Sequence, residues 1–171
     1  MSTTPNRLNR PSRAAIEQID ELQSRYIAAL DSKNMSDWLA TFSNAADASY
    51  ICTTAENVEN NLPLAWILDD NHARLEDRVT FITRVWAGTY TDYRTRHFVQ
   101  RTACRDLGEG VHEVESNFMI LYTPADTGRA EVFADGVYLD RILVNGDSAV
   151  FLSKKAITDT PVVQRYVVFP L

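Results

Sequence analysis

The stretch Tyr93-Arg94-Thr95-Arg96-His97 marks the place where the sequence changes from helical to strand-like patterns. Before it, apolar residues recur mostly at helical spacing. After it, four long strand-like runs follow one another, joined by short loops. This order predicts an α+β domain in which three N-terminal helices pack on one face of a strongly curved, mainly antiparallel sheet. Such a cone-shaped arrangement has a hollow that either serves catalysis or is filled by packed side chains.

The composition is that of an ordinary soluble globular protein. The chain has 171 residues, of which 45% are hydrophobic and 23% are charged. We expect residues 1–11 to form a flexible tail and residues 12–171 to form one domain. The formal net charge of −6 argues against nucleic acid or an anionic membrane as a partner, because both are bound through clustered Lys and Arg. No apolar run reaches the roughly 20 residues that cross a bilayer, and the first residues lack a signal-peptide core, so we expect a cytoplasmic protein.

Helix-capping residues place the three helices. Ser12 is a suitable N-cap for a first helix that extends to about Leu30. Ser36 is expected to cap a short second helix, and Asp69 or Asp70 is expected to cap a third. Each helix carries apolar residues on one side, which predicts that all three pack against the sheet.

Strand signals cover most of the remaining sequence. We expect a polar loop over residues 57–63, a bend or bulge at Gly136, and a tight two-residue hairpin turn at Asn145-Gly146, because both turn residues tolerate positive φ. The predicted strands cover residues 48–54, 94–107, 111–122, 129–144 and 149–157. The strand over 111–122 becomes apolar on both faces from Phe118 onward, which suggests a cover on each side.

The sequence contains no recognisable metal or nucleophile motif. Its three histidines, His72, His97 and His112, lie on different predicted elements without metal-ligand spacing. Cys52 and Cys104 are far apart and have no adjacent base, so we expect free thiols. We therefore predict no metal site, no catalytic residue and no cofactor in this chain.

Acid–base chemistry in the hollow is the main alternative. Asp31, Tyr50 and His97 could place a carboxylate, a hydroxyl and an imidazole around its mouth. In the competing interpretation, which we favour, Asp31 is a local helix cap and Tyr50 is a core aromatic residue. The alternative protein would be a free-standing dehydratase or isomerase, or a dimer that binds a small ligand.

A basic cluster opens the first long strand and is a candidate subunit interface. Arginine is enriched at interface cores, where it pairs with carboxylates in two-point contacts. The apolar run over residues 162–169 also favours an interface, because such a run is seldom left in water. The candidate interface residues are Tyr93, Arg94, Arg96, His97 and Arg101.

Several motifs, in this order, resemble one protein family. The motifs are residues 26–31 (YIAALD), 38–42 (WLATF), 94–97 (RTRH), 136–141 (GVYLDR), 153–157 (SKKAI) and the final Pro170-Leu171. The first two, followed by residues 47–50 (DASY), resemble the opening of the NTF2-like (cystatin-like) superfamily. The whole set resembles the small, or beta, subunit of Rieske-type aromatic-ring-hydroxylating dioxygenases, most closely subunits of enzymes that act on aromatic acids.

The resemblance implies a function that lies mainly in a partner chain. It implies an alpha subunit that carries the Rieske 2Fe-2S cluster and the mononuclear iron, and a beta subunit that holds an alpha3beta3 assembly together. Electrons would come from a reductase or ferredoxin, and the aromatic substrate would be hydroxylated with O2. If the chain is such a subunit, we expect its hollow to be filled by side chains such as Trp66, Phe118 or Phe133.

Overall fold

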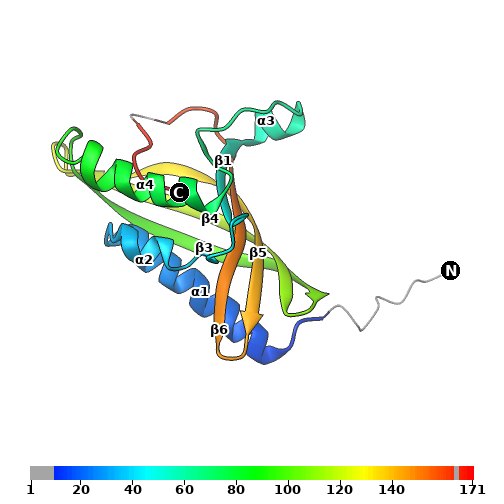
Figure 1. Cartoon of the computed structure of the whole chain (residues 1–171). Coiled ribbons are helices and arrows are strands. Elements are labelled where there is room, and N and C mark those ends of the chain that lie inside the picture. Colours follow the sequence, from blue (N-terminus) through cyan, green and yellow to red (C-terminus); the bar gives the residue numbers. More distant parts are fainter. Residues whose placement is uncertain (1–9, 164–165) are drawn as a thin grey trace.

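The computed structural model describes residues 10–163 and 166–171, in which one sheet curves around a helical layer (Figure 1). The described strands have the order β2-β1-β6-β5-β4-β3, and every neighbouring pair is antiparallel except β1 and β6. The elements are α1 (Arg13–Asp31), α2 (Met35–Leu39), β1 (Ser49–Thr54), α3 (Ala55–Glu59), β2 (Ile67–Asp69), α4 (His72–Thr80), the π-helical turn η2 (Phe81–Val85), β3 (Tyr93–Gly108), β4 (Val111–Pro124), β5 (Glu131–Asn145) and β6 (Ser148–Thr158).

The predicted α+β architecture is confirmed. Strands β3 to β6 form the expected meander, and α1 lies along the hollow side of the sheet (Figure 1). The predicted tail over residues 1–11 falls almost wholly outside the described residues, so this part stays a prediction. No helix in the described ranges is long and apolar enough to cross a membrane.

Helix α1 begins where its cap predicts. Ser12 Oγ accepts a hydrogen bond from the backbone N–H of Ala15, which satisfies one of the free N–H groups at the helix start. One side of the helix is fully buried against the sheet, with Ile19, Leu22 and Tyr26 among its core residues. The helix therefore lines the hollow along its length.

The second helix is capped by a different residue from the one predicted. Asn34 Oδ1 accepts from the backbone N–H of Asp37, so Asn34 is the N-cap and Ser36 lies inside the helix. Asn is as strong a cap as Ser, and the tight turn after α1 places it first.

The third helix is present as α4, but its predicted cap is also wrong. Asn71 caps α4, because its side chain accepts from the backbone N–H of Arg74. Asp69 is buried at the end of β2 and binds Arg78 through two hydrogen bonds of 3.0 Å. Asp70 lies at the surface, 3.4 Å from Arg74. Both aspartates that we predicted as caps thus pair with arginines instead.

A short helix, α3, overlaps the first residues of the predicted polar loop over 57–63. Thr54 ends β1 and its hydroxyl accepts from the backbone N–H of Asn57, which starts α3. After α3 the chain returns as β2, which pairs antiparallel with β1. Figure 1 shows α3 projecting from one end of the sheet.

Two glycines in β5 and its turn shape the sheet. The hairpin between β5 and β6 is confirmed, but Asn145 pairs with Ser148, so the turn residues are Gly146 and Asp147, one position later than predicted. Gly136 has φ of 152°, and a Cβ there would lie 2.0 Å from the carbonyl oxygen of Ile157. Gly136 thus permits a close approach of β6, while the β5 bulge itself lies three residues earlier, at position 133.

Candidate functional site

Asp31 links the end of α1 to the start of β3. Its carboxylate lies 2.7 Å from His97 Nδ1, accepts from the Thr95 hydroxyl at 2.9 Å, and accepts from the backbone N–H of His97 at 3.3 Å. Burial by itself would raise the pKa of Asp31, but the hydrogen bonds from His97 and Thr95 outweigh it and lower this pKa. Asp31 is therefore not a local helix cap as expected, because its partners lie on a strand.

Two tyrosines hold the end of the described chain inside the hollow. The Tyr26 hydroxyl donates to the main-chain oxygen of Leu171 at 2.7 Å, and the Tyr50 hydroxyl lies 3.2 Å from the same atom. The Leu171 N–H donates back to Tyr50 at 2.8 Å. Val168, Phe169 and Leu171 are all buried. The prediction that Tyr50 is a core residue is thus correct, but its hydrogen bonds to Leu171 were not predicted.

Of the Asp31–His97 pair, the histidine is closed off from solvent, whereas the Asp31 side chain stays 16% exposed. The His97 side chain is 2% exposed, and the cavity that it lines with Phe169 and Leu171 has a volume of about 10 Å³. This volume is about that of a single water site. The structure therefore brings together two of the three acid–base candidates, Asp31 and His97, and shows no opening beside them for a substrate.

The hollow is filled mainly as expected for a subunit. Phe118 is buried and stacks on Tyr138 with ring centroids 4.3 Å apart, and Phe133 is buried as well. Trp66 is only half-buried. The filler that the sequence did not predict is the segment 168–171, whose first two residues end the apolar run 162–169 that we assigned to an interface. Within that run, Val162 is 70% exposed and residues 164–165 lie outside the described residues.

β5 and β6 contain a buried ion pair that the sequence patterns do not predict. Lys154 Nζ lies 2.9 Å from Asp140 Oδ2 and 3.3 Å from Gln23 Oε1, and both charged side chains are 0% exposed. Burial lowers the pKa of Lys154 and raises that of Asp140, while their mutual attraction opposes both changes. The ammonium also lies 3.7 Å from the centroid of the Tyr138 ring. Both residues belong to motifs that carry the family resemblance.

The candidate interface residues divide between the two faces of β3. Tyr93 and His97 point into the core, and Arg101 forms an ion pair of 2.8 Å with Asp20 of α1. Arg94 and Arg96 point outward. Of the five candidate interface residues, Arg94 and Arg96 are thus the two that are presented to another molecule.

An apolar strip lies beside the outward arginines. Phe98 is 53% exposed and pairs across the strands with Met119, which is 37% exposed. In the next row of the sheet, Arg96 pairs with Leu121, which pairs with Val132, 49% exposed. We define the outer strip as Arg94, Arg96, Phe98, Met119, Leu121 and Val132.

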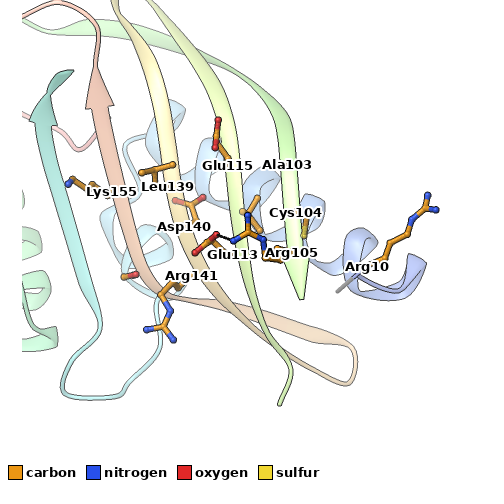
Figure 2. Close-up of a pocket in the computed structure, with 12 residues that line it drawn as sticks. Arg10, Ala103, Cys104, Arg105, Glu113, Glu115, Leu139, Asp140, Arg141 and Lys155 are labelled. Atoms are coloured by element: carbon orange, nitrogen blue, oxygen red, sulfur yellow. Dashed lines mark hydrogen bonds and ion pairs between the residues drawn. The ribbon is translucent and has the colours of Figure 1, made fainter. Parts of the chain in front are cut away.

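A charged hollow of about 730 Å³ lies farther along the outer face (Figure 2). Its charged side chains Arg105, Glu113 and Arg141 lie opposite one another on neighbouring strands, and Figure 2 shows Arg10 off to one side of them. Arg105 and Glu113 form an ion pair of 3.0 Å, and Arg141 and Lys155 add positive charge. The outer face thus carries an apolar area and a charged area.

The residues that could hold a metal ion are dispersed. His72 lies on α4, His97 on β3 and His112 on β4, and within the described ranges no three His, Cys, Asp or Glu side chains form a metal-binding group. Both cysteines are free, and burial raises the pKa of Cys52 to about 12. No arrangement among the described residues fits a Rieske cluster, which needs paired Cys and His ligands.

The curved sheet wrapped around α1 defines the class of protein as an NTF2-like, or cystatin-like, domain. A protein with a cystatin-like fold from Nostoc punctiforme superposes with a TM-score of 0.62, covering 91% of this chain and 98% of its own, at 14% identity.

Residues 25–165 match the family described as ring hydroxylating beta subunit, and the chain belongs to this family. The beta 2 subunit of the terminal oxygenase component of terephthalate 1,2-dioxygenase from Comamonas sp. is 26% identical over 154 residues, which cover 90% of this chain and 97% of the relative. A beta subunit assigned to an aromatic-ring-hydroxylating dioxygenase from Novosphingobium aromaticivorans is 25% identical, with a TM-score of 0.79, covering 94% of this chain and all of that one. These similarities confirm the family that the sequence motifs indicated.

Proposed function

We propose that this chain is a non-catalytic subunit that assembles with the alpha subunit of an aromatic-ring-hydroxylating oxygenase. The observation that supports this most is the closed hollow, in which the chain's own segment 168–171 occupies the space beside Asp31 and His97. Family membership supports the same role. A domain that fills its own hollow and presents apolar and cationic side chains outward is suited to holding other subunits.

The chemistry would take place in the alpha subunit. In the proposed assembly, that subunit holds the Rieske 2Fe-2S cluster and the mononuclear iron, and the complex has the composition alpha3beta3. It would hydroxylate an aromatic acid in the cytoplasm, with O2 and with electrons from a reductase or ferredoxin. The terephthalate relative supports an aromatic acid as the substrate class.

The outer strip is the proposed contact with the alpha subunit. Arg94 and Arg96 would pair with carboxylates of the partner, around an apolar centre that includes Phe98 and Met119. The other predicted interface residues, Tyr93, His97 and Arg101, would act indirectly, because their side chains anchor β3 to the core and to α1.

Charge reversal at the strip tests this proposal. We expect Arg96→Glu to reduce co-purification with a tagged alpha subunit at least tenfold, since repulsion replaces a paired charge at the interface. Arg84→Glu on η2, an exposed arginine on the helical side, is the matched control and should co-purify normally. Circular dichroism of the isolated variant shows whether it is folded. A folded Arg96→Glu chain that binds alpha as well as the control does would exclude Arg96 from the interface.

A free-standing dehydratase or isomerase is the second candidate. Its support is the 2.7 Å contact between Asp31 and His97, with the Tyr50 hydroxyl also inside the hollow. This function requires the segment 168–171 to leave. Turnover of a test substrate by the isolated chain, lost in Asp31→Asn, would favour this candidate over the subunit role.

A further inference from the structure

The tip that α3 and the loop after it form is an exposed apolar surface. Val58 on α3 is 39% exposed, and Leu62 and Leu64 in the loop are 46% and 58% exposed. Single exposed apolar side chains are ordinary, but a group of them so close together is typical of a surface that another molecule covers. Figure 1 shows α3 projecting from the end of the sheet, so this surface is open to an approaching partner.

Hydrogen bonds to the rest of the domain fix the shape of the tip. The Leu62 N–H donates to the carbonyl oxygen of Asn57 at 2.8 Å, which folds the loop back on α3. The Thr53 hydroxyl of β1 donates to the carbonyl oxygen of Leu64 at 2.6 Å, which ties the loop to the sheet. A surface that is already held in one shape loses little conformational entropy when a partner binds.

The tip is also acidic. Glu56 and Glu59 are exposed, and neither forms an ion pair with another described residue. Residues 34–71, which include the tip, contain no Lys, Arg or His. A partner that suits this surface therefore carries positive charge beside an apolar side chain.

The chain itself contains a segment of that chemistry. Residues 1–12 include two arginines, Arg7 and Arg10, and no Asp or Glu. Leu8 lies between the arginines in the sequence. The two arginines are three positions apart, as the two glutamates of the tip are. The segment thus matches the tip in charge, in spacing and in its apolar residue.

The position of Arg10 excludes the tip of the same copy. Arg10 is exposed and lies beside β3, where it lines the charged hollow with Ala103 and Cys104, whereas the tip follows β1. Four strand spacings separate β1 from β3, which amounts to roughly 19 Å. Arg7 is three residues from Arg10, so their backbones lie at most about 11 Å apart. Both arginines together can therefore meet only the tip of another copy.

We propose that the basic segment 7–10 of one copy docks on the tip of a second copy of this chain. The two arginines would pair with the two glutamates, and Leu8 would pack against Val58 and Leu64. Because two different surfaces meet, the contact is heterologous and can close a ring of identical subunits. It involves neither the alpha subunit nor the outer strip, so this contact and the proposed function can fail separately.

Peptide binding to the full-length chain tests the contact. The probe is a fluorescent synthetic peptide of residues 1–14, and its binding is followed by fluorescence anisotropy. We expect saturable binding at low salt that weakens at least tenfold between about 20 mM and about 300 mM salt, because the charge pairs are exposed and screened. A peptide with Arg7→Glu and Arg10→Glu should bind at least tenfold more weakly.

Charge reversal on the tip locates the binding surface. Glu56→Lys with Glu59→Lys should weaken binding of the unaltered peptide at least tenfold and should restore binding of the charge-reversed peptide. The matched control, Glu109→Lys with Asp147→Lys, makes the same change of charge in two exposed turns and should bind the unaltered peptide normally. Circular dichroism checks folding, and Glu56→Gln with Glu59→Gln replaces the tip variant if the lysines prevent it.

Sedimentation velocity of the chain without alpha shows whether a second copy is involved. At low salt, the sedimentation coefficient should rise with protein concentration, and Arg7→Glu with Arg10→Glu should reduce this rise. The proposal is overturned by a peptide that does not bind at low salt, or by equal binding to the tip variant and its control. It is also overturned if the unaltered chain shows no association that depends on concentration.

Discussion

Replacing Lys154 by methionine should destabilise the domain by about 3–5 kcal/mol, because it removes one partner of a buried ion pair. The Lys154 ammonium has no solvent contact, and its neighbours are Asp140 at 2.9 Å, Gln23 at 3.3 Å and the ring centroid of Tyr138 at 3.7 Å. Methionine has a similar length, so little cavity forms and the cost is mainly electrostatic.

The magnitude depends on the charge that remains. Without Lys154, the Asp140 carboxylate keeps only the hydrogen bond from Gln23 at 2.7 Å, and its other oxygen has no partner among the described residues. Burial already raises the pKa of Asp140, and loss of the ammonium would raise this pKa further. The cost of Lys154→Met should therefore shrink as the pH is lowered, because protonation of Asp140 removes the unpaired charge.

Urea unfolding followed by circular dichroism measures these changes. Lys155→Met is the matched control, since the adjacent lysine lies on the outer face and should change the free energy of unfolding by no more than about 0.5 kcal/mol. Combining Lys154→Met with Asp140→Leu should recover most of the loss. The reasoning is refuted if Lys154→Met costs less than about 1 kcal/mol, or if the double variant is no more stable than the single one.

Two other features give predictions that separate backbone strain from electrostatics. Gly136→Ala should lower the free energy of unfolding in urea by at least about 3 kcal/mol, because the new Cβ would lie 2.0 Å from the Ile157 oxygen. The control Gly128→Ala also has positive φ, but its Cβ would meet no atom within 4 Å, so it should cost about 1 kcal/mol. Similar losses for both variants would contradict this prediction. The lowered pKa of Asp31 makes its bonds to His97 and β3 stabilising above the ordinary pKa of 3.8, and this stability is lost as the pH falls through the lowered value. Melting temperatures between pH 2 and pH 6 should therefore fall less steeply in acid for Asp31→Asn than for the unaltered chain, and parallel curves would argue against the effect.

The order of the elements was predictable because its signals are local. Ser12 caps the first helix through a bond to a residue three positions away, and the β5–β6 hairpin follows from a glycine turn. The parallel pairing of β1 with β6 has no local signal, since it joins residues such as Tyr50 and Lys154 that are far apart in the sequence. The packing of segment 168–171 in the hollow was not predicted for the same reason, because it depends on contacts with α1, far away in the sequence.

The buried ion pair was not predictable from the alternation of inward and outward residues, because β6 contains an irregularity. Along β6, Phe151 points inward, so strict alternation would turn Ser153 inward and Lys154 outward. A register shift between Phe151 and Ser153 reverses the alternation, and Lys154 faces Asp140 in the core. Asp31 and His97 were each named as candidates, but only the observed register of β3 brings them within 2.7 Å.

The central claim is that this chain assembles with an alpha subunit and leaves the chemistry to it. Co-expression with the cognate alpha subunit, followed by native mass spectrometry of the purified complex, tests this directly. We predict a single complex with equal numbers of both subunits, of composition alpha3beta3, in which ring hydroxylation requires alpha. The claim would be contradicted by a chain that stays free of alpha as a monomer or dimer and converts a substrate alone.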